Sequence, residues 1–423
     1  MAKLPSLLEA DLHRKIVLVR MDHNVVKKGK IKDPMRIEAT IPTLLHIYKK
    51  GGLPILMTHV GRPYDKKTGQ ITIDAGDTVE PIVKYLEEKL QLKGVIPKCG
   101  AKGTEGITDL APIGAAVQAM REGKADFVYL PNTRWFRGEE AKDGSADVLA
   151  TELASFAEVY VNDAFGSWQA HASTFNVAQK LPSFAGLLML KEIANLQKIF
   201  EPRRPLVSVV AGSKFDTKIG PLSSLIKISD KLVLGGVLYN AYLAVKYQLS
   251  IKGLGPDDLE LAERFIQEIG SYQDRIVEPP FIVESDSFEN ADIHRTHDIR
   301  KLKPGTELNF VLDIAPESFA DEQVKAVFTG AQTIFVNAVM GYTTLFTAGT
   351  KAMYSLIDTC AEAQKLYGGG DTIQDFRALL PGIFANAAND PRYYFFTGGG
   401  AILDAIVQGS PYGMKPVQAL LRD

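Results

Sequence analysis

The sequence predicts an α/β protein made of two doubly wound, Rossmann-like domains, each with a parallel sheet, joined by a hinge helix. One observation is the alternation of apolar, β-rich runs with helical patterns along the chain. A second is the length of 423 residues, which exceeds one ordinary domain. A third is that the apolar runs are continuous, as in strands buried on both faces of a parallel sheet. The clearest runs are Lys15–Met21, Leu53–Met57, Phe127–Leu130, Glu158–Val161, Leu206–Val210, Lys231–Leu234, Leu308–Leu312, Thr333–Val336 and Tyr393–Phe396.

Helical patterns lie between these runs. The spacing of apolar residues predicts helices over Arg36–Lys50, Asp77–Leu90 and Asp257–Ile269. A further apolar pattern runs from Phe184 to Ile199 and is stopped at Pro202, so we expect it to link the two halves. The sequence therefore predicts a first domain over residues 1–182 and a second over residues 183–407.

Composition excludes several classes of protein. Lys plus Arg is 48 and Asp plus Glu is 50, so a net charge of -2 disfavours a nucleic-acid-binding protein. Two cysteines cannot form a disulfide framework or a four-cysteine zinc site. The N-terminus carries no signal-peptide pattern, and no apolar stretch is typical of a membrane span. We therefore expect a cytoplasmic protein, and a monomer.

Polar and basic side chains follow the strands of the first half. The first run leads into Asp22 and Asn24, the second into His59 and Arg62, and the third into Arg134. Ligands of open α/β sheets sit beyond the carboxyl ends of the strands. Together with the helix-opening Arg36, these side chains predict a site for a small anion, although Asp22 and Asn24 alone could simply shape a turn.

Glycines and lysines follow the strands of the second half. Glycine lets the backbone approach a ligand, helix N-termini favour phosphate, and lysine neutralises phosphate charge. This half therefore predicts a nucleotide site, although the lysines could be solvated and Asp371 could be a helix N-cap. Neither a P-loop nor a dinucleotide fingerprint is present. The candidate residues are Gly212, Lys214, Lys218, Gly235, Gly236, Asn337, Gly370, Asp371 and Thr372.

These segments resemble phosphoglycerate kinases over nearly the whole chain. The matching pieces are Val17–Val25, Met57–Pro63, Asn132–Phe136 with Glu139 and Glu140, Val161–Gly166, Ala170–Thr174, Gly212–Ile219, Gly368–Thr372 and Thr397–Gly400. The family interconverts 1,3-bisphosphoglycerate plus ADP with 3-phosphoglycerate plus ATP. The resemblance also implies that the C-terminal segment, residues 408–423, returns to the first domain.

The resemblance assigns roles to the candidate residues. Asp22, Asn24, Arg36, His59, Arg62 and Arg134 are implied to line the phosphoglycerate site. The second-half residues are implied to hold ATP or ADP and its Mg²⁺, with Asp371 as the metal partner. Phosphoryl transfer needs alignment and neutralisation of charge rather than a covalent intermediate. Arg36 and Lys214 are the expected catalytic residues, and direct in-line transfer after hinge closure is expected.

Two departures from the family pattern leave alternatives open. Gln169 stands where an arginine is usual, in a loop one residue shorter, and Trp168 could close part of the pocket; this also makes the role of His171 uncertain. Thr344 stands where a glutamate is usual. A degenerate homologue that binds ligands with little turnover, or a kinase of another small carboxylate, are the alternative hypotheses.

Overall fold

The structure is a computed structural model that describes residues 3–212, 219–290 and 292–421. It divides into two compact units, Met1–Ile193 with Tyr412–Asp423, and Ala194–Pro411. This division falls inside helix α5 (Leu187–Phe200), whereas the sequence placed the boundary at residue 182. Lys214 and Lys218 lie outside the described residues.

The first unit is built on one parallel sheet, which has six strands within the described residues. The strand order is β5-β6-β4-β1-β7-β8, and every pairing is parallel. The strands are β1 (Ile16–Met21), β4 (Leu53–Met57), β5 (Gly94–Val95), β6 (Phe127–Tyr129), β7 (Val159–Asp163) and β8 (Ser183–Ala185). The helices are α1 (Met35–Lys49), α2 (Glu80–Leu90), α3 (Ala111–Arg121), α4 (Ser145–Ser155) and α15 (Lys415–Gln418), and a hairpin joins β2 (Val26–Lys27) to β3 (Lys30–Ile31).

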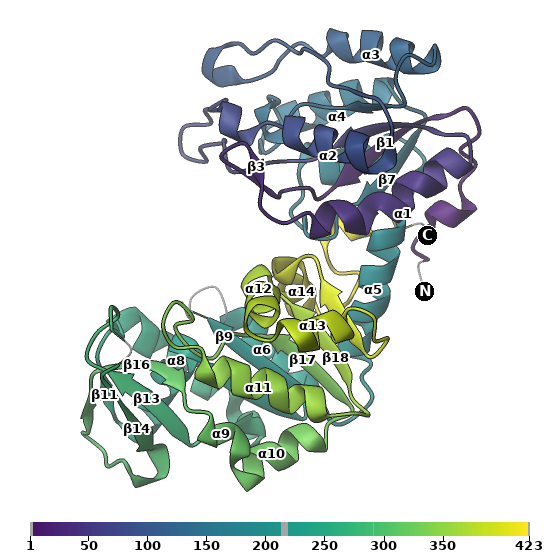
Figure 1. The fold of residues 1–423 in the computed structure, drawn as a ribbon. Coiled ribbons are helices and arrows are strands. Elements are labelled where there is room, and N and C mark those ends of the chain that lie inside the picture. The colour runs from purple at the N-terminus through teal and green to yellow at the C-terminus, as the bar shows by residue number, and fades with distance from the viewer. Residues whose placement is uncertain (1–2, 213–218, 291, 422–423) are drawn as a thin grey trace. The chain divides into compact units, whose positions relative to one another are not determined.

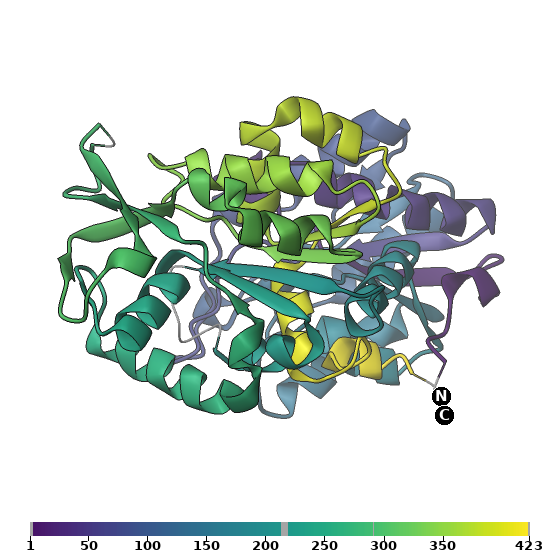
Figure 2. The same cartoon turned by 90° about the horizontal axis from the view of Figure 1, so that it is seen from below.

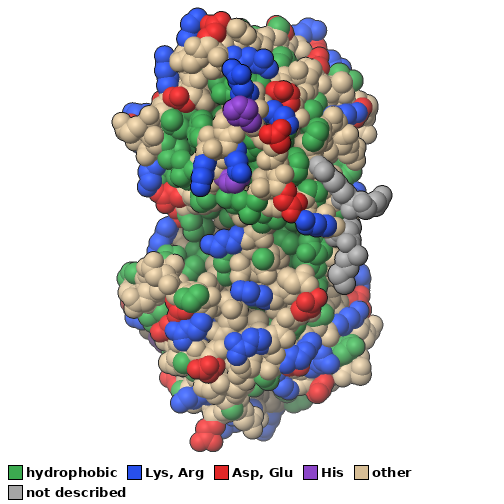
Figure 3. Space-filling model, turned by 90° about the vertical axis from the view of Figure 1, so that its right-hand side faces the viewer, with side chains coloured by type: hydrophobic (Ala, Val, Ile, Leu, Met, Phe, Trp, Pro, Cys, Tyr) green, Lys and Arg blue, Asp and Glu red, His purple; other side chains and the backbone are tan. Residues whose placement is uncertain are grey.

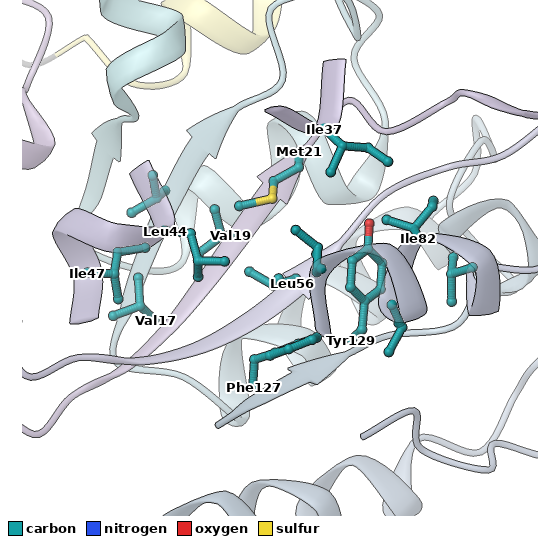
Figure 4. Close-up of a cluster of buried hydrophobic side chains, with 14 of the residues drawn as sticks. Val17, Val19, Met21, Ile37, Leu44, Ile47, Leu56, Ile82, Phe127 and Tyr129 are labelled. Carbon is teal, nitrogen blue, oxygen red and sulfur yellow. The ribbon is translucent and has the colours of Figure 1, made fainter. Parts of the chain in front are cut away.

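The alternation of β1 side chains between the two faces of the sheet organises this unit. Val17, Val19 and Met21 point into a core that α1 and α2 cover (Figures 1 and 4). Arg20, between two of these residues, must therefore point to the opposite face, where it is fully buried. There it contacts the short helical turn η5 (Ala172–Asn176), which also packs against α15.

The second unit also has a parallel sheet of six strands in the part of the chain that the structure describes. The strand order is β12-β10-β9-β17-β18-β19, so strands are added on one side of β9 first and then, from β17 on, on its other side. Seen from below, the sheet lies between light green helices and teal helices (Figure 2). The strands are β9 (Leu206–Gly212), β10 (Lys231–Gly235), β12 (Ile276–Val277), β17 (Thr333–Asn337), β18 (Gln364–Gly368) and β19 (Tyr393–Phe396). The helices are α6 (Ile219–Ile228), α7 (Gly236–Tyr247), α8 (Pro256–Ile269), α9 (Glu317–Ala320), α10 (Glu322–Thr329), α11 (Ala348–Thr359), α12 (Gly370–Leu379), α13 (Pro381–Ala387) and α14 (Gly399–Val407).

The prediction of two parallel-sheet α/β domains is confirmed, but one predicted strand was misplaced. The run Leu308–Leu312 was expected in the parallel sheet, and it contributes instead to β15 (Glu307–Leu308) and β16 (Phe310–Ile314). β16 belongs to a separate antiparallel sheet with β13 (Phe281–Ser285) and β14 (His294–Asp298), and β15 pairs with β11 (Ser250–Ile251). A small core cluster that includes Leu312 and Phe346 packs at this antiparallel sheet, and β16 also contacts α7 and α11.

Two surface observations bear on the excluded protein classes. No helix among the described residues is both long and apolar enough to cross a membrane. On the face drawn in Figure 3, Lys and Arg side chains are scattered among acidic and uncharged ones.

Candidate active site

A cavity of about 650 Å³ lies beyond the carboxyl ends of the first unit's strands. Four of the residues predicted for the anion site line it, namely Asn24, His59, Arg62 and Arg134. The loop after β7 contributes Trp168, Gln169 and His171 to the same wall. The structure therefore brings together side chains from the loops after β1, β4, β6 and β7, the edge at which ligands of open α/β sheets bind.

The loop after β4 is held in place by Asn132. Its Oδ1 accepts from the Val60 backbone N–H (3.0 Å) and its Nδ2 donates to the Val60 carbonyl (2.7 Å). Gly61 takes the left-handed φ of 65°, and a Cβ there would lie 2.4 Å from Asp77 Oδ2. Asn24 Oδ1 accepts from the Gly61 N–H (3.1 Å). These bonds fix the backbone from which His59 and Arg62 project.

Arg134 ties two loops of the cavity together. Its Nη1 donates to the Gly61 carbonyl (2.5 Å), and its Nε lies 2.5 Å from Glu140 Oε1. His171 Nε2 lies 3.8 Å from the same carboxylate oxygen. Arg134 is thus partly engaged in scaffolding before any ligand arrives.

Both histidines of the cavity are neutral near pH 7. Burial lowers the pKa of His59 well below its usual value, and the charges of Arg20 and Arg134 add to this effect. Burial also lowers the pKa of His171 to about 4, although Glu140 acts in the opposite direction. Arg20 Nη2 lies 2.9 Å from His59 Nδ1, and because arginine can only donate, Nδ1 accepts and the proton sits on Nε2. His59 can therefore offer an Nε2–H hydrogen bond to a ligand.

Asp22 and Arg36 form a pair of their own. Arg36 Nη1 donates to Asp22 Oδ2 (3.1 Å), and neither residue is part of the cavity lining. Asp22 is buried, and its Oδ1 has no hydrogen-bond partner in the part of the chain that the structure describes. A buried acceptor without a partner is costly, so this oxygen needs a donor that the described residues do not supply.

Sequence reasoning missed Arg20, which lies in a strand interior rather than at a strand end. Its Nε donates to Ser173 Oγ (2.9 Å), and Ser173 Oγ in turn donates to the buried Glu139 (2.6 Å). This chain of hydrogen bonds holds η5 against β1. The available signal was a single charge inside the apolar run Ile16–Met21. Lys66 and Tyr64, which also line the cavity, were missed as well because they lie on a loop beyond the recognised motif.

The described residues of the predicted nucleotide site share the carboxyl edge of the second unit's sheet. Gly212, Gly235 and Asn337 end β9, β10 and β17. Gly236 begins α7, and Gly370, Asp371 and Thr372 begin α12. The edge includes the reversal of strand order between β9 and β17, which is where such folds bind nucleotides.

Glycines at this edge allow the backbone to approach closely. Gly236 has a φ of 61°, and a Cβ there would lie 2.9 Å from the Gly212 carbonyl oxygen. Gly369 has a φ of 110°, and its Cβ would lie 2.8 Å from Asn337 Nδ2, which donates to the Gly368 carbonyl (2.6 Å). Larger residues would push these loops apart.

Three helix N-termini open toward the same edge of this sheet. Among the described residues, no side chain caps the first turns of α7, α12 or α14. Capping side chains therefore do not occupy these N-termini, although Gly236 of α7 forms a backbone bridge with Gly212, and the helix dipoles favour negative charge there. Asp371 is exposed in the first turn of α12 and Thr372 is buried, whereas Thr344 is exposed in the loop after β17.

Comparisons with known proteins agree with this architecture. The family model for phosphoglycerate kinase matches residues 7–409. The phosphoglycerate kinase of Roseiflexus sp. (strain RS-1) is 34% identical over 408 residues, 95% of each chain. That of Azorhizobium caulinodans is 35% identical over 410 residues, covering 94% of this chain and 95% of the relative.

Solved structures share the fold. The phosphoglycerate kinase of Coxiella burnetii superposes with a TM-score of 0.77 at 24% identity, and that of Pyrococcus horikoshii OT3 with 0.74 at 20% identity. Each alignment covers 99% of both chains. With a family match over nearly the whole sequence and relatives above 30% identity, this chain is a member of the phosphoglycerate kinase family.

Proposed function

We propose that this kinase transfers a phosphoryl group reversibly between 1,3-bisphosphoglycerate with ADP and 3-phosphoglycerate with ATP, as a step of glycolysis. The observation that carries the proposal is the charge of the first unit's cavity. Arg20, Arg62, Lys66 and Arg134 line it against the single carboxylate of Glu140, and its two histidines are neutral. Such a cavity favours a small polyanion.

The first-unit residues would bind the phosphoglycerate by complementary hydrogen bonds. Arg62 and Arg134 offer guanidinium groups, which match phosphate and carboxylate geometry. His59 offers its Nε2–H. Asp22 Oδ1 would accept the substrate hydroxyl proton, because that buried oxygen has no other partner among the described residues. Asn24 would contribute through the loop that it holds at Gly61.

The second-unit residues would bind ATP or ADP. The N-termini of α7 and α12 would receive phosphate oxygens, and Gly212, Gly235, Gly236 and Gly370 would let the nucleotide lie close to the backbone. Asn337 and Thr372 would add polar contacts at this edge. Lys214 and Lys218 would neutralise phosphate charge; both lie outside the described residues.

A magnesium ion accompanying the nucleotide fits the residues present. Mg²⁺ prefers oxygen ligands and is usually held by one or two carboxylates plus substrate phosphates. Asp371 supplies one exposed carboxylate, and no cluster of three or more metal-binding side chains exists among the described residues. When bound, the ion would supply neutralisation of charge on the phosphate oxygens.

Arg36 and Lys214 are the proposed catalytic residues. Both would neutralise charge that develops on the transferring phosphoryl group, and no covalent intermediate is required. Arg36 is held by Asp22 at 3.1 Å, which would orient its guanidinium. Direct in-line transfer requires the two bound substrates to meet, so we propose hinge closure with bending near Pro182 and along α5. X-ray scattering curves that are identical with no ligand, with either and with both would contradict this motion.

A coupled assay tests the activity. Purified protein with 3-phosphoglycerate and MgATP should turn over far faster than the Lys214→Ala variant. Equal rates for the two proteins would reject the proposed kinase activity. Calorimetric binding of both ligands without turnover would instead support the degenerate-homologue hypothesis, to which Gln169 and Thr344 give a chemical basis. A cytoplasmic location and a monomeric state stay predictions.

A further inference from the structure

We propose that Lys66 is a substrate-binding residue, and that its ammonium group contributes positive charge to the same cavity wall where Gln169 contributes none. Lys66 belongs to the loop after β4 and lines the 650 Å³ cavity together with Arg62 and Gln169. The inference rests on the proposed function, because it takes phosphoglycerate to be the anion that occupies this cavity.

Lys66 lines the same cavity as the loop after β7, and its charge acts on that loop. The pKa of His171 is lowered chiefly by burial, and Lys66 is among the cations whose charges add to this lowering. His171 and Gln169 are two residues apart on one loop, and both line the cavity. Lys66 therefore adds positive charge to the cavity that the uncharged Gln169 also lines.

Lys66 is also uncommitted, as Arg62 is, unlike Arg20 and Arg134 of the same cavity. Arg20 is bonded to Ser173 and His59, Arg134 is paired with Glu140, and Arg36 lies outside the cavity. The side chains of Lys66 and Arg62 make no ion pair or hydrogen bond within the described ranges 3–212, 219–290 and 292–421. An ammonium group that has no protein partner can bind an incoming anion without breaking an existing bond.

The loop that carries Lys66 is fixed by short-range bonds. Asp65 donates its N–H to the Gln70 carbonyl (2.9 Å), and Gly69 donates to the Asp65 carbonyl (2.8 Å). Asp65 Oδ1 accepts from the Lys67 N–H (2.7 Å). Because this turn closes on itself, Lys66 projects from a defined backbone, whereas its neighbour Lys67 does not line the cavity. Lys67 is thus a matched control of the same charge and length.

Titration calorimetry with 3-phosphoglycerate tests the proposal. Lys66→Met should weaken binding about tenfold, the worth of one partly exposed charge-assisted contact, and Lys66→Arg should restore most of it. Lys67→Met should bind within about twofold of the parent, which sets the effect of net charge alone. In steady-state assays Lys66→Met should raise the KM for 3-phosphoglycerate and leave the KM for MgATP unchanged.

The outcomes separate this inference from the proposed function. Equal binding by Lys66→Met and Lys67→Met, with weakened binding by Arg62→Met, would overturn the role of Lys66 and leave the substrate assignment standing. A parent protein that binds no 3-phosphoglycerate, or an Arg62→Met variant that binds like the parent, would reject the substrate site and the role of Lys66 with it. Because Lys66 is exposed, thermal melting of its variants should match the parent and exclude misfolding as the cause.

Discussion

Replacing Gln169 by arginine should tighten the binding of 3-phosphoglycerate. The structure places Gln169 on the wall of the cavity, and its backbone is anchored there. Thr174 Oγ1 donates to the Gln169 carbonyl (2.7 Å) and accepts from the His171 N–H (3.0 Å). A longer side chain at this position therefore starts from a fixed backbone at the cavity, even though the loop is one residue shorter than is usual in the family.

The expected gain follows from one added charge-assisted contact. Such a hydrogen bond contributes about 1.5–3 kcal/mol when it is well formed. Gln169 is exposed, so solvent screening reduces the gain toward the lower end of that range. In the empty cavity the new guanidinium would also be repelled by Arg62 and Lys66, and a bound anion would relieve that repulsion. We therefore expect a gain of about 1.4 kcal/mol, which is a tenfold lower Kd.

Calorimetric titrations of 3-phosphoglycerate into the parent and four variants measure this effect. Gln169→Arg should bind about tenfold more tightly than the parent. Gln179→Arg adds the same charge at an exposed site of the same unit that does not line the cavity, and it should bind like the parent. Arg62→Ala should weaken binding far more than Gln169→Ala. Identical affinities for the parent and all four variants would show that the substrate binds elsewhere.

The remaining predictions concern stability and pH. Burial raises the pKa of Asp163 to about 6, so its contribution to stability is present below about pH 4 and is lost as the pH rises through about 6. Asp163→Asn should remove this pH-dependent loss, which amounts to up to about 3 kcal/mol. The melting temperature of the variant should therefore fall less from pH 4 to 7 than that of the parent. Ser173→Ala should lower the free energy of unfolding by about 1–3 kcal/mol in chemical denaturation, because two buried charged side chains lose its hydroxyl; an unchanged midpoint would contradict this. Gly349→Ala should destabilise the second unit, because its Cβ would lie 1.9 Å from a backbone oxygen. The Cβ of Gly382→Ala would meet nothing within 4 Å, so this variant should change the melting temperature little. Equal melting temperatures of the two variants would refute the steric argument.

The fold was predictable to the extent that local patterns report burial. Continuous apolar runs correctly indicated most strands of the two parallel sheets, but such runs do not specify pairing direction, so β16 was placed in the wrong sheet. β18 gave no apolar run because it begins Gln364-Lys365. Lys365 is nevertheless buried, with its ammonium 4.6 Å from the Tyr393 ring centroid. Strand order depends on contacts between distant segments, which no local pattern contains.

The strand-end rule predicted part of the cavity lining, although Asp22, which directly follows β1, does not line the cavity. Asn24, His59, Arg62 and Arg134 follow strands of one parallel sheet, whose carboxyl ends must share an edge, and all four line one cavity. Lys66 lies on a loop whose return to the cavity depends on its own turn, and no strand-end rule reaches it. The role of His171 was left uncertain from sequence, and the structure places its side chain in the cavity because η5 is bonded to Glu139.

The cations of the cavity divide into two groups according to whether they already make hydrogen bonds or ion pairs with other described residues. Arg20 and Arg134 are bonded to backbone carbonyls, to His59 and to Glu140, so they set the shape of the site before a ligand arrives. Arg62 and Lys66 have no such partners among the described residues, so their charges are available to the ligand. Removing a cation of the first group should therefore impair folding and binding together, whereas removing one of the second should impair binding alone. Because the charges of Arg62 and Lys66 are available, the cavity keeps positive charge without an arginine at position 169.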